Sequence, residues 1–355
     1  MGPAPEPEVG GVRRRRSTST GPRNVRITEV AKAAGVSTAT VSRVLNGVAS
    51  VAPDLVESVN RAITATGYVP NGAGRALRRQ RADTWAAVVP DVQNPFFTSV
   101  VAEVEEVALA HGYSVVLCNT AERLDRERRY LATVVAHRMS GVLLAPASHQ
   151  YSDIAALRAA HIPVVLVDRV PVDADADTVV VDNLLAGSLA AQHLVAHGYR
   201  RLACITGPRD ASATEDRLLG FRRALAAAGV DFTDDMVRRS DLRSGSAEVA
   251  MRSLLAGANP PDGVFAANGP CTLGAFRGIQ AHGLSLSTDV GLVGTDDDVW
   301  TRMVSPAVTV IQQPVQQIGR YAGELLASRS AGSADPPHRI TLTPTLIVRG
   351  SSARL

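Results

Sequence analysis

The stretch ITEVAKAAGVSTATVSRVLN, from Ile27 to Asn46, decides the fold of the N-terminal part of this chain. Its first half predicts a short helix, because apolar side chains recur at the helical spacing i, i+3, i+4 and i+7: Ile27, Val30, Ala31 and Ala34. Gly35 is expected to end this helix, since glycine adopts the left-handed conformation of a helix terminus at little cost.

A second short helix is expected directly after this glycine. Ser37 has the residue type and the position of an N-cap for a helix from Thr38 to about Leu45. Val41 and Val44 would face the first helix, whereas the opposite face carries small residues and one arginine: Thr38, Ala39, Ser42 and Arg43. This pattern predicts a helix-turn-helix whose second helix enters the major groove of DNA.

The alternative is an ordinary pair of helices packed inside a core. That interpretation is disfavoured because Thr38, Ser42 and Arg43 would then be buried. Burying such groups without partners costs about 1–3 kcal/mol each. A DNA-binding role is therefore the preferred hypothesis.

The segments around this motif differ in composition. Residues 1–24 are rich in Pro, Gly, Ser, Thr and Arg and predict a disordered basic tail. A third helix is expected from Pro53 to Thr66, with Val56, Val59 and Ile63 on its inner side and Gly67 at its end. Residues 71–83, NGAGRALRRQRAD, have on their own the composition of a charged linker.

The distribution of charge separates a basic head from an acidic body. Residues 1–82 hold 13 Lys and Arg against 5 Asp and Glu, a formal charge of +8, and the remainder holds 24 against 29, a charge of −5. A basic segment joined to an acidic body is typical of a nucleic-acid-binding module attached to another domain. No apolar run is long enough to span a membrane, and polar residues follow the arginines at 13–16, so we expect a cytoplasmic protein.

Beyond residue 84 the chain alternates between apolar runs and amphipathic stretches, which predicts βαβ units and doubly wound parallel sheets. The predicted buried strands are Ala86–Val89, Val115–Leu117, Val142–Leu144, Val164–Val167, Val179–Val181, Leu202–Ile205, Val264–Ala267, Leu292–Val293 and Val308–Ile311. The predicted helices include Val100–His111, Leu184–His197, Arg217–Ala228 and Leu273–His282. Similar Ala-His-Gly helix endings recur at 110–112, 196–198 and 281–283, as expected for two similar halves.

The sequence contains no motif that favours catalysis. A nucleophile elbow, a Walker loop, a dinucleotide-binding glycine motif and a metal-ligand spacing are all absent. Five of the eight histidines fall at predicted helix C-termini, where they complement the helix dipole: His111, His137, His161, His197 and His282. Three widely spaced cysteines predict free thiols rather than a disulfide. We therefore expect no enzyme, no cofactor and no metal, and a binding cleft outside the carboxyl ends of the strands.

Two observations carry a resemblance to a known family. The run VAKAAGVSTATVSRVLN from Val30 to Asn46, together with GYVPN at 67–71, resembles the headpiece of the lactose-repressor (LacI) family of bacterial transcription regulators. The run PDVQNPFF from Pro90 to Phe97 is similar to the same family's pattern after its first strand. The resemblance extends to about Arg349.

The resemblance implies a multidomain α+β chain. An all-α helix-turn-helix headpiece at 25–70 and a hinge at 71–83 would precede an α/β periplasmic-binding-protein-like domain at 84–355. That domain would have two Rossmann-like lobes, an N-lobe of about 84–184 plus 312–340 and a C-lobe of about 185–311 plus the C-terminal strand. The hinge would form a helix on DNA, where Leu77 would wedge open a base step.

Candidate site residues follow from the motifs and the resemblance together. The candidates for DNA binding are Thr28, Ser37, Thr38, Ala39, Thr40, Ser42, Arg43, Asn46, Tyr68, Asn71, Arg75 and Leu77. The candidates for effector binding are Asp91, Asn94, Phe96, Phe97, Arg169, Arg217, Asn268 and Asp296. The two aromatic rings suit a stacking wall for a small ring such as a sugar, and pairing of Arg217 with Asp296 would recognise vicinal hydroxyls.

Several positions depart from the family pattern, and three of them bear on helix stability or on the polar contacts of the cleft. Ala52 stands where a capping Ser or Thr is usual, Gly74 replaces an alanine of the hinge, and Gly269 stands where an aspartate is usual. The first two are expected to weaken the third helix and the hinge helix, and the third removes one expected polar contact or helix cap.

The functional prediction is a transcription regulator, most simply a repressor, controlled by a sugar in the cleft. Its partners would be a pseudo-palindromic double-stranded operator, a small-molecule effector and a second copy of the chain, with pairing of dimers into tetramers left open and no membrane partner. The alternatives are an activator, and a sugar-sensing protein with a vestigial headpiece. The protein would associate with the nucleoid when bound to DNA.

Overall fold

The computed structural model describes residues 1–2, 25–45, 50–68 and 81–354. These residues form two compact units, one on each side of residues 69–80, and each unit is considered by itself. The predicted tail at 3–24 and most of the predicted hinge lie outside the described residues. Four candidate DNA-binding residues also lie outside them: Asn46, Asn71, Arg75 and Leu77.

The first unit is a bundle of three helices, α1 (Ile27–Ala34), α2 (Thr38–Leu45) and α3 (Pro53–Thr66). Gly35 follows α1 with φ +68°, and Ser37 caps α2 by accepting a 3.1 Å hydrogen bond from the Thr40 N–H. Both observations confirm the turn predicted from the sequence. The small core joins all three helices through Val30, Ala31, Val41, Val59 and Ala62.

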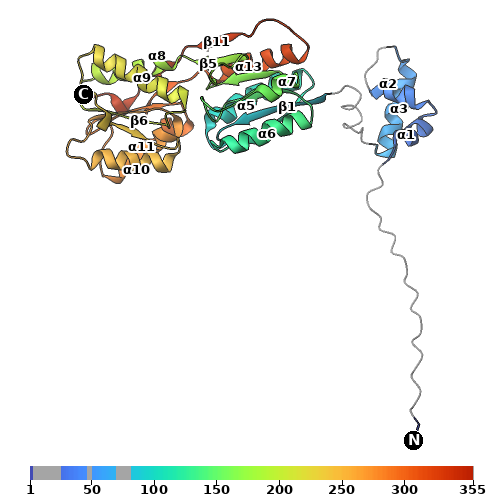
Figure 1. Ribbon diagram of the computed structural model, residues 1–355, viewed down its shortest axis with the longest axis horizontal. Coiled ribbons are helices and arrows are strands. Elements are labelled where there is room, and N and C mark those ends of the chain that lie inside the picture. The colour runs from blue at the N-terminus through green and yellow to red at the C-terminus, as the bar shows by residue number, and fades with distance from the viewer. Residues whose placement is uncertain (3–24, 46–49, 69–80, 355) are drawn as a thin grey trace. The chain divides into compact units, whose positions relative to one another are not determined.

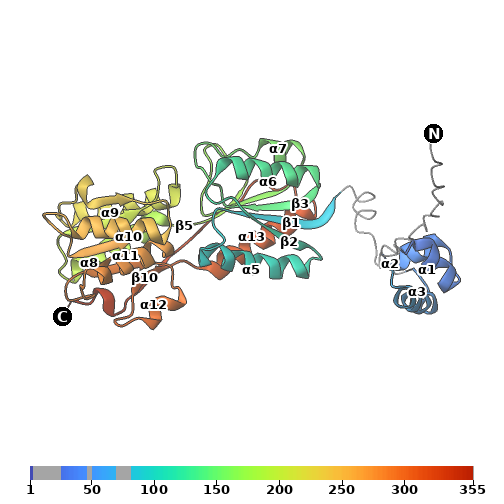
Figure 2. The ribbon, with the colours of Figure 1, turned by 90° about the horizontal axis from the view of Figure 1, so that it is seen from below.

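The second unit contains two six-stranded sheets that lie side by side, as Figures 1 and 2 show. The first sheet is entirely parallel and has the order β11-β5-β4-β3-β1-β2. Its strands are β1 (Ala82–Val89), β2 (Ser114–Asn119), β3 (Met139–Leu144), β4 (Val164–Val167), β5 (Asp177–Val181) and β11 (Arg339–Leu342). Helices α5 (Pro95–Ala110) and α13 (Val315–Ser330) cover one face, and α6 (Leu124–Ala136) and α7 (Ala155–Ala159) cover the other.

The second sheet repeats this arrangement with the order β12-β10-β9-β8-β6-β7. Its strands are β6 (Leu202–Thr206), β7 (Val237–Arg239), β8 (Gly263–Ala266), β9 (Gly291–Thr295), β10 (Thr309–Gln312) and β12 (Thr345–Ile347). Helices α8 (Asn183–Ala196) and α9 (Ser212–Ala227) cover one face, and α10 (Ser244–Leu255) and α11 (Gly269–Ala281) cover the other. The short α12 (Val299–Met303) follows β9, and the turns η1 (Asp234–Met236) and η2 (Gly350–Ser352) complete the unit.

The predicted doubly wound architecture is confirmed, with differences at the sheet edges. The run 115–117 was expected to be buried, but β2 is an edge strand in which Val116 and Leu117 are 43% and 44% exposed. Strands β7, β11 and β12 carry no apolar run that periodicity could detect, and β12 pairs antiparallel with β10. Strand β1 begins at Ala82, two residues inside the predicted hinge, because Ala82 and Asp83 already join the sheet.

The chain passes between the two lobes at three places: after β5, after β10 and after β11. Consequently the loops at the carboxyl ends of both sheets face each other across the boundary between the lobes. In parallel sheets these ends are where ligands bind. Among the described residues, no helix has the length and apolar character needed to cross a membrane.

Several histidines have the structural role that their positions predicted. His111, His197 and His282 end α5, α8 and α11, and each donates from Nδ1 to the carbonyl oxygen four residues earlier, at 2.8–3.0 Å. His137 likewise ends α6. His161 lies two residues beyond Ala159, the last residue of α7, and directly after the C-cap Ala160.

Candidate ligand-binding site and nucleic-acid interface

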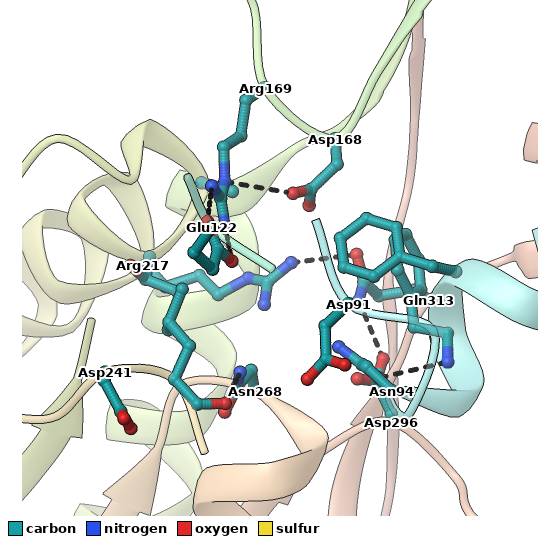
Figure 3. Close-up of a pocket in the computed structure, with 15 residues that line it drawn as sticks. Asp91, Asn94, Glu122, Asp168, Arg169, Arg217, Asp241, Asn268, Asp296 and Gln313 are labelled. Carbon is teal, nitrogen blue, oxygen red and sulfur yellow. Dashed lines mark hydrogen bonds and ion pairs between the residues drawn. The ribbon is translucent and has the colours of Figure 1, made fainter. Parts of the chain in front are cut away.

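A pocket between the two lobes brings together all eight residues predicted to bind the effector, and Figure 3 shows it in detail. Its volume is about 480 Å³ including the part open to solvent. The lining residues that the sequence predicted are Asp91, Asn94, Phe96, Phe97, Arg169, Arg217, Asn268 and Asp296. The further lining residues are Glu122, Asp168, Ala213, Thr214, Asp241, Leu242 and Gln313.

The first wall comes from the loop between β1 and α5. Asp91 accepts a 2.9 Å hydrogen bond from the Gln93 N–H, and Asn94 caps α5 by accepting 3.1 Å from the Phe96 N–H. Phe96 and Phe97 meet edge to face at 5.0 Å and are only 5% and 4% exposed. Both rings therefore belong to the core beneath α5 as well as to the pocket wall.

Arg169 is buried beside two acidic groups. Its two terminal nitrogens donate to Glu122 at 2.7 and 2.8 Å, and Asp168 lies 3.4 Å from Nε. Burial lowers the pKa of Arg169, but the hydrogen bonds and charge of Glu122 outweigh it, so the pKa lies above its ordinary value. The Nε–H group itself has no hydrogen-bond acceptor among the described residues.

Arg217 is held in the opposite lobe by close packing of α8 on α9. A Cβ atom at Gly187 would lie 1.8 Å from the Arg217 carbonyl oxygen, so only glycine permits this approach of the two backbones. The guanidinium is 2% exposed and donates to Asn183 at 2.8 Å, to the Ala267 carbonyl at 2.7 Å and to Gln313 at 2.8 Å. Burial lowers the pKa of Arg217 below its ordinary value.

Arg217 and Asp296, which were predicted to recognise vicinal hydroxyls together, both line the pocket and are linked through Gln313. Gln313 stands between them: its side-chain oxygen accepts from Arg217, and its nitrogen donates to Asp296 at 2.7 Å (Figure 3). An amide can serve both neighbours because it carries a donor and an acceptor. The sequence analysis missed Gln313, although its position directly after β10 is one of the strand ends that line the cleft.

Asp296 is buried with two donors and no direct cation partner among the described residues. One carboxylate oxygen accepts from Gln313 and the other accepts from the Gly269 N–H at 3.2 Å. Burial raises the pKa of Asp296, and also that of Asp168, above the ordinary value of an aspartate. Asn268 caps α11 by accepting a 2.8 Å hydrogen bond from the Cys271 N–H. This helix therefore has a side-chain cap even though residue 269 is a glycine.

The pocket also gathers unusual backbone conformations. Four of its non-glycine residues have positive φ in the loops that follow β2, β4, β7 and β9: Glu122 (58°), Asp168 (63°), Leu242 (66°) and Asp296 (70°). Such conformations are held at a cost of about 1–3 kcal/mol and cluster at functional sites. They turn side chains inward at the strand ends.

The electrostatics of the pocket define what it can bind. Five carboxylates line it against two guanidiniums, and both guanidiniums already donate to protein acceptors. Carboxylates accept hydrogen bonds only, so the arrangement suits a ligand rich in hydroxyl donors. No three His, Cys, Asp or Glu side chains in the described ranges converge as metal ligands would.

The candidate DNA-binding residues of the first unit lie on and beside α2. Among them, five are exposed: Thr28, Ser37, Thr38, Ala39 and Arg43. The partly buried ones are Thr40, Ser42 and Tyr68. Ser37 and Thr40 join their hydroxyls at 3.0 Å, and Tyr68 packs against the headpiece core. The unit therefore presents a short helix with a small, polar, arginine-bearing surface.

Comparison with known proteins places both units in one family. Residues 26–71 match the family described as bacterial regulatory proteins, lacI family, and residues 82–343 match periplasmic binding proteins and sugar binding domain of LacI family. The chain is 34% identical to the ribose operon repressor of Escherichia coli K12 over 91% of this chain and 98% of that one. It is 37% identical to the regulator CelR of Thermobifida fusca over 91% and 96%.

The structural comparison agrees. The solved structure titled transcriptional regulator CelR-cellobiose complex superposes with a TM-score of 0.70 at 34% identity and covers 92% of this chain and 99% of that chain. The chain therefore belongs to the LacI family of bacterial regulatory proteins and is a DNA-binding transcription regulator with a helix-turn-helix headpiece and a sugar-binding domain.

Proposed function

We propose that this chain represses transcription by binding a pseudo-palindromic operator as a homodimer and that a sugar in the interlobe pocket controls its affinity for DNA. The observation that supports this most directly is the convergence, in one pocket between two lobes, of side chains that follow eight strands of the two sheets. A ligand held by both lobes stabilises one arrangement of them, and this preference is what couples the pocket to DNA binding.

In the headpiece, Arg43, Ser42 and Thr38 would contact base edges from α2, and Ala39 would offer only an apolar contact to a thymine methyl. Thr28, Ser37, Thr40 and Tyr68 would contact the phosphate backbone, together with Asn46, Asn71 and Arg75. Leu77 would intercalate in the minor groove.

We propose a neutral sugar as the effector. The excess of carboxylates repels acids and phosphates, and neither guanidinium is free to compensate a ligand's negative charge. Hydroxyl groups can donate to Asp91, Asp241 and Asp296, and a ligand oxygen can accept from the unused Nε–H of Arg169. The solved complex of the relative CelR is with a neutral sugar, cellobiose.

The test uses the full chain and the intergenic DNA upstream of its own coding region. In a fluorescence anisotropy titration at fixed moderate salt, that DNA should bind more tightly than a random duplex of equal length. A panel of sugars should then change the DNA affinity, and a neutral sugar should act where its acid or phosphate does not. Equal affinity for both duplexes, with and without sugars, would contradict the proposal. A sugar that strengthens DNA binding would identify a corepressor, and stimulation of transcription would identify an activator.

Arg217→Ala tests the assignment of the pocket, and Arg223→Ala is its matched control because Arg223 is exposed on the same helix. The first variant should bind DNA normally but lose its response to the sugar, since Asn183 and Gln313 lose the group that holds them. The control should respond like the parent. An unchanged response in Arg217→Ala, with its fold verified by circular dichroism, would exclude this pocket as the effector site.

A further inference from the structure

A carboxylate occupies a core position of α6. Glu127, Leu131 and Val134 are the buried residues of this helix, and their spacing of four and three residues places them on one face. Leu131 and Val134 pack in the apolar core of the first lobe, whereas Glu127 brings an acidic side chain with no exposed surface to the same side of the helix. Burying a carboxylate is unfavourable unless donors satisfy it. The hydrogen bonds of Glu127 are therefore what distinguishes it from an apolar residue at this position.

Glu127 holds the loop that follows β3, residues 145–154. Its Oε2 accepts a 2.6 Å hydrogen bond from the Ala147 N–H, which is shorter than an ordinary N–H···O bond, as charge-assisted bonds are. Its Oε1 has no hydrogen-bond partner among the described residues. Burial raises the pKa of Glu127 above its ordinary value, although the Ala147 N–H and the Ser152 hydroxyl both favour the charged form. The side chain thus interacts with the loop at two places.

The peptide bond between Pro146 and Ala147 lies between Glu127 and the ligand-binding pocket. Its N–H donates to Glu127, and its carbonyl oxygen accepts a 3.3 Å hydrogen bond from the guanidinium of Arg169, which lines the pocket in Figure 3. The two bonds are aligned from a cation through the peptide to an acid, an arrangement in which each bond strengthens the other. The start of the loop is therefore held from both sides.

The tip of the loop reaches the second lobe. The Ser152 hydroxyl accepts from the Ser148 N–H at 3.1 Å, and the Ser148 hydroxyl accepts from the Tyr151 N–H at 2.7 Å. Between these serines, the Gln150 N–H donates to the carboxylate of Asp210, in the second lobe, at 3.0 Å. The contact between the lobes therefore depends on the conformation in which the loop is held.

We infer that Glu127 is a positioning residue for the contact between the lobes: through the Ala147 N–H it fixes the loop so that the Gln150 N–H reaches Asp210. Glu127 does not line the pocket, so it acts on the arrangement of the lobes through this loop. The inference concerns the protein without ligand and goes beyond the proposed function, which needs only that the lobes have more than one arrangement.

The experiment measures amide hydrogen exchange in the full chain without DNA or sugar, resolved to single residues, with the amides of β1 as the reference for global unfolding. Glu127→Ala should speed exchange of the Ala147 and Gln150 amides about tenfold relative to β1, because the loop loses a charge-assisted hydrogen bond. Asp125→Ala is the control, since Asp125 is an exposed acid on the same helix. It should leave both rates unchanged.

Two further substitutions separate hydrogen bonding from core packing. Glu127→Gln keeps an acceptor oxygen and should return the Gln150 exchange rate to within about threefold of the parent, since a neutral acceptor gives a weaker bond. Glu127→Leu fills the same space without an acceptor, so its Gln150 amide should exchange as fast as in Glu127→Ala. Equal rescue by the Gln and Leu substitutions would show that Glu127 only fills space and would overturn the inference.

A double variant tests the connection to the second lobe. Asp210→Ala removes the acceptor of the Gln150 N–H and should speed its exchange about tenfold. Adding Glu127→Ala should then change this rate by less than about twofold, because the contact through which Glu127 acts is already absent. Additive effects of the two substitutions, or a Gln150 rate that does not respond to Asp210→Ala, would overturn the inference. Both results would leave the proposed binding of DNA and sugar untouched, because neither ligand is present in the measurement.

Discussion

Arg43 is an exposed arginine on α2, the helix predicted to enter the major groove. Arg43→Ala should weaken binding to the preferred DNA by about 1–3 kcal/mol and relax the preference at one base pair, because a bidentate contact to guanine would be lost. The measurement is an anisotropy titration against a set of operator variants. Arg61→Ala is the control: Arg61 is also exposed, but it lies on α3 and pairs with Glu57 at 3.0 Å. A loss of equal size on every duplex would make Arg43 a phosphate contact instead.

The pKa values of two adjacent aspartates at the start of α12 shift in opposite directions. Asp297 accepts from Arg349 at 2.6 Å and from Arg302. Burial raises its pKa, but these bonds outweigh burial and hold the pKa below its ordinary value. Burial and the nearby charge of Asp296 instead raise the pKa of Asp298 to about 6. The charged form is therefore favoured by folding at Asp297 and disfavoured at Asp298.

Asp298→Asn should accordingly be more stable than the parent at pH 8, by about 1–2 kcal/mol after allowance for solvent screening. This advantage should shrink as the pH falls through 6 and vanish near 4, where both states of the parent become protonated. Asp297→Asn should be less stable than the parent at neutral pH, and that deficit should disappear only below the ordinary pKa of an aspartate. Urea unfolding between pH 4 and 8 measures the free energy of unfolding of both variants and of the parent. Parallel pH profiles for the two variants would contradict the opposite electrostatic environments.

The start of α3 lacks a side-chain cap. Ala52 occupies the N-cap position and offers no side-chain acceptor, so the first turn is favoured only by Pro53 and by the acidic Asp54. Ala52→Ser should stabilise the headpiece by about 1 kcal/mol. Hydrogen exchange of the α3 amides in the full chain reports this as slower exchange. Ala65→Ser makes the same chemical change at an exposed position within α3 and should not slow exchange, since serine has the lower helix propensity. Equal protection in both variants would show that capping does not limit this helix.

On the scale of the whole second unit, the two lobes also touch away from the three crossing segments. The loop after β3 donates from the His149 N–H to the Asp210 carbonyl at 3.2 Å and from the Gln150 N–H to the Asp210 carboxylate at 3.0 Å. Asp210 belongs to the opposite lobe, between β6 and α9. These bonds therefore favour the arrangement in which the lobes are close.

Asp210 does not line the pocket. Asp210→Ala should nevertheless lower the affinity for the sugar about fivefold, because the arrangement with the lobes close together loses the hydrogen bond from the Gln150 N–H to the Asp210 carboxylate. Asp231→Ala, at an exposed aspartate of the same lobe, should have no effect. Calorimetric titration measures both affinities, and small-angle scattering measures the separation of the lobes. An unchanged affinity in Asp210→Ala would show that this contact does not bias closure.

The elements that sequence alone determined are those with a strong local signal. The glycine turn and Ser37 cap of the headpiece, and the inner strands of both sheets, depend on local residue type and on continuous apolar runs, and the structure has them. All eight predicted pocket residues also converge, because parallel strands bring their carboxyl ends to one edge.

The tertiary structure decided what depends on partners distant in the sequence. β7, β11 and β12 join their sheets through backbone pairing rather than apolar patterning, and β2 is exposed because it lies at an edge. The link from Arg217 to Asp296 passes through Gln313, 96 residues away from Arg217. The pocket between the lobes exists only where loops from both lobes meet. Local sequence encodes turns, caps and buried strands, whereas hydrogen-bond partners and cavities arise only when separate strand ends are brought together.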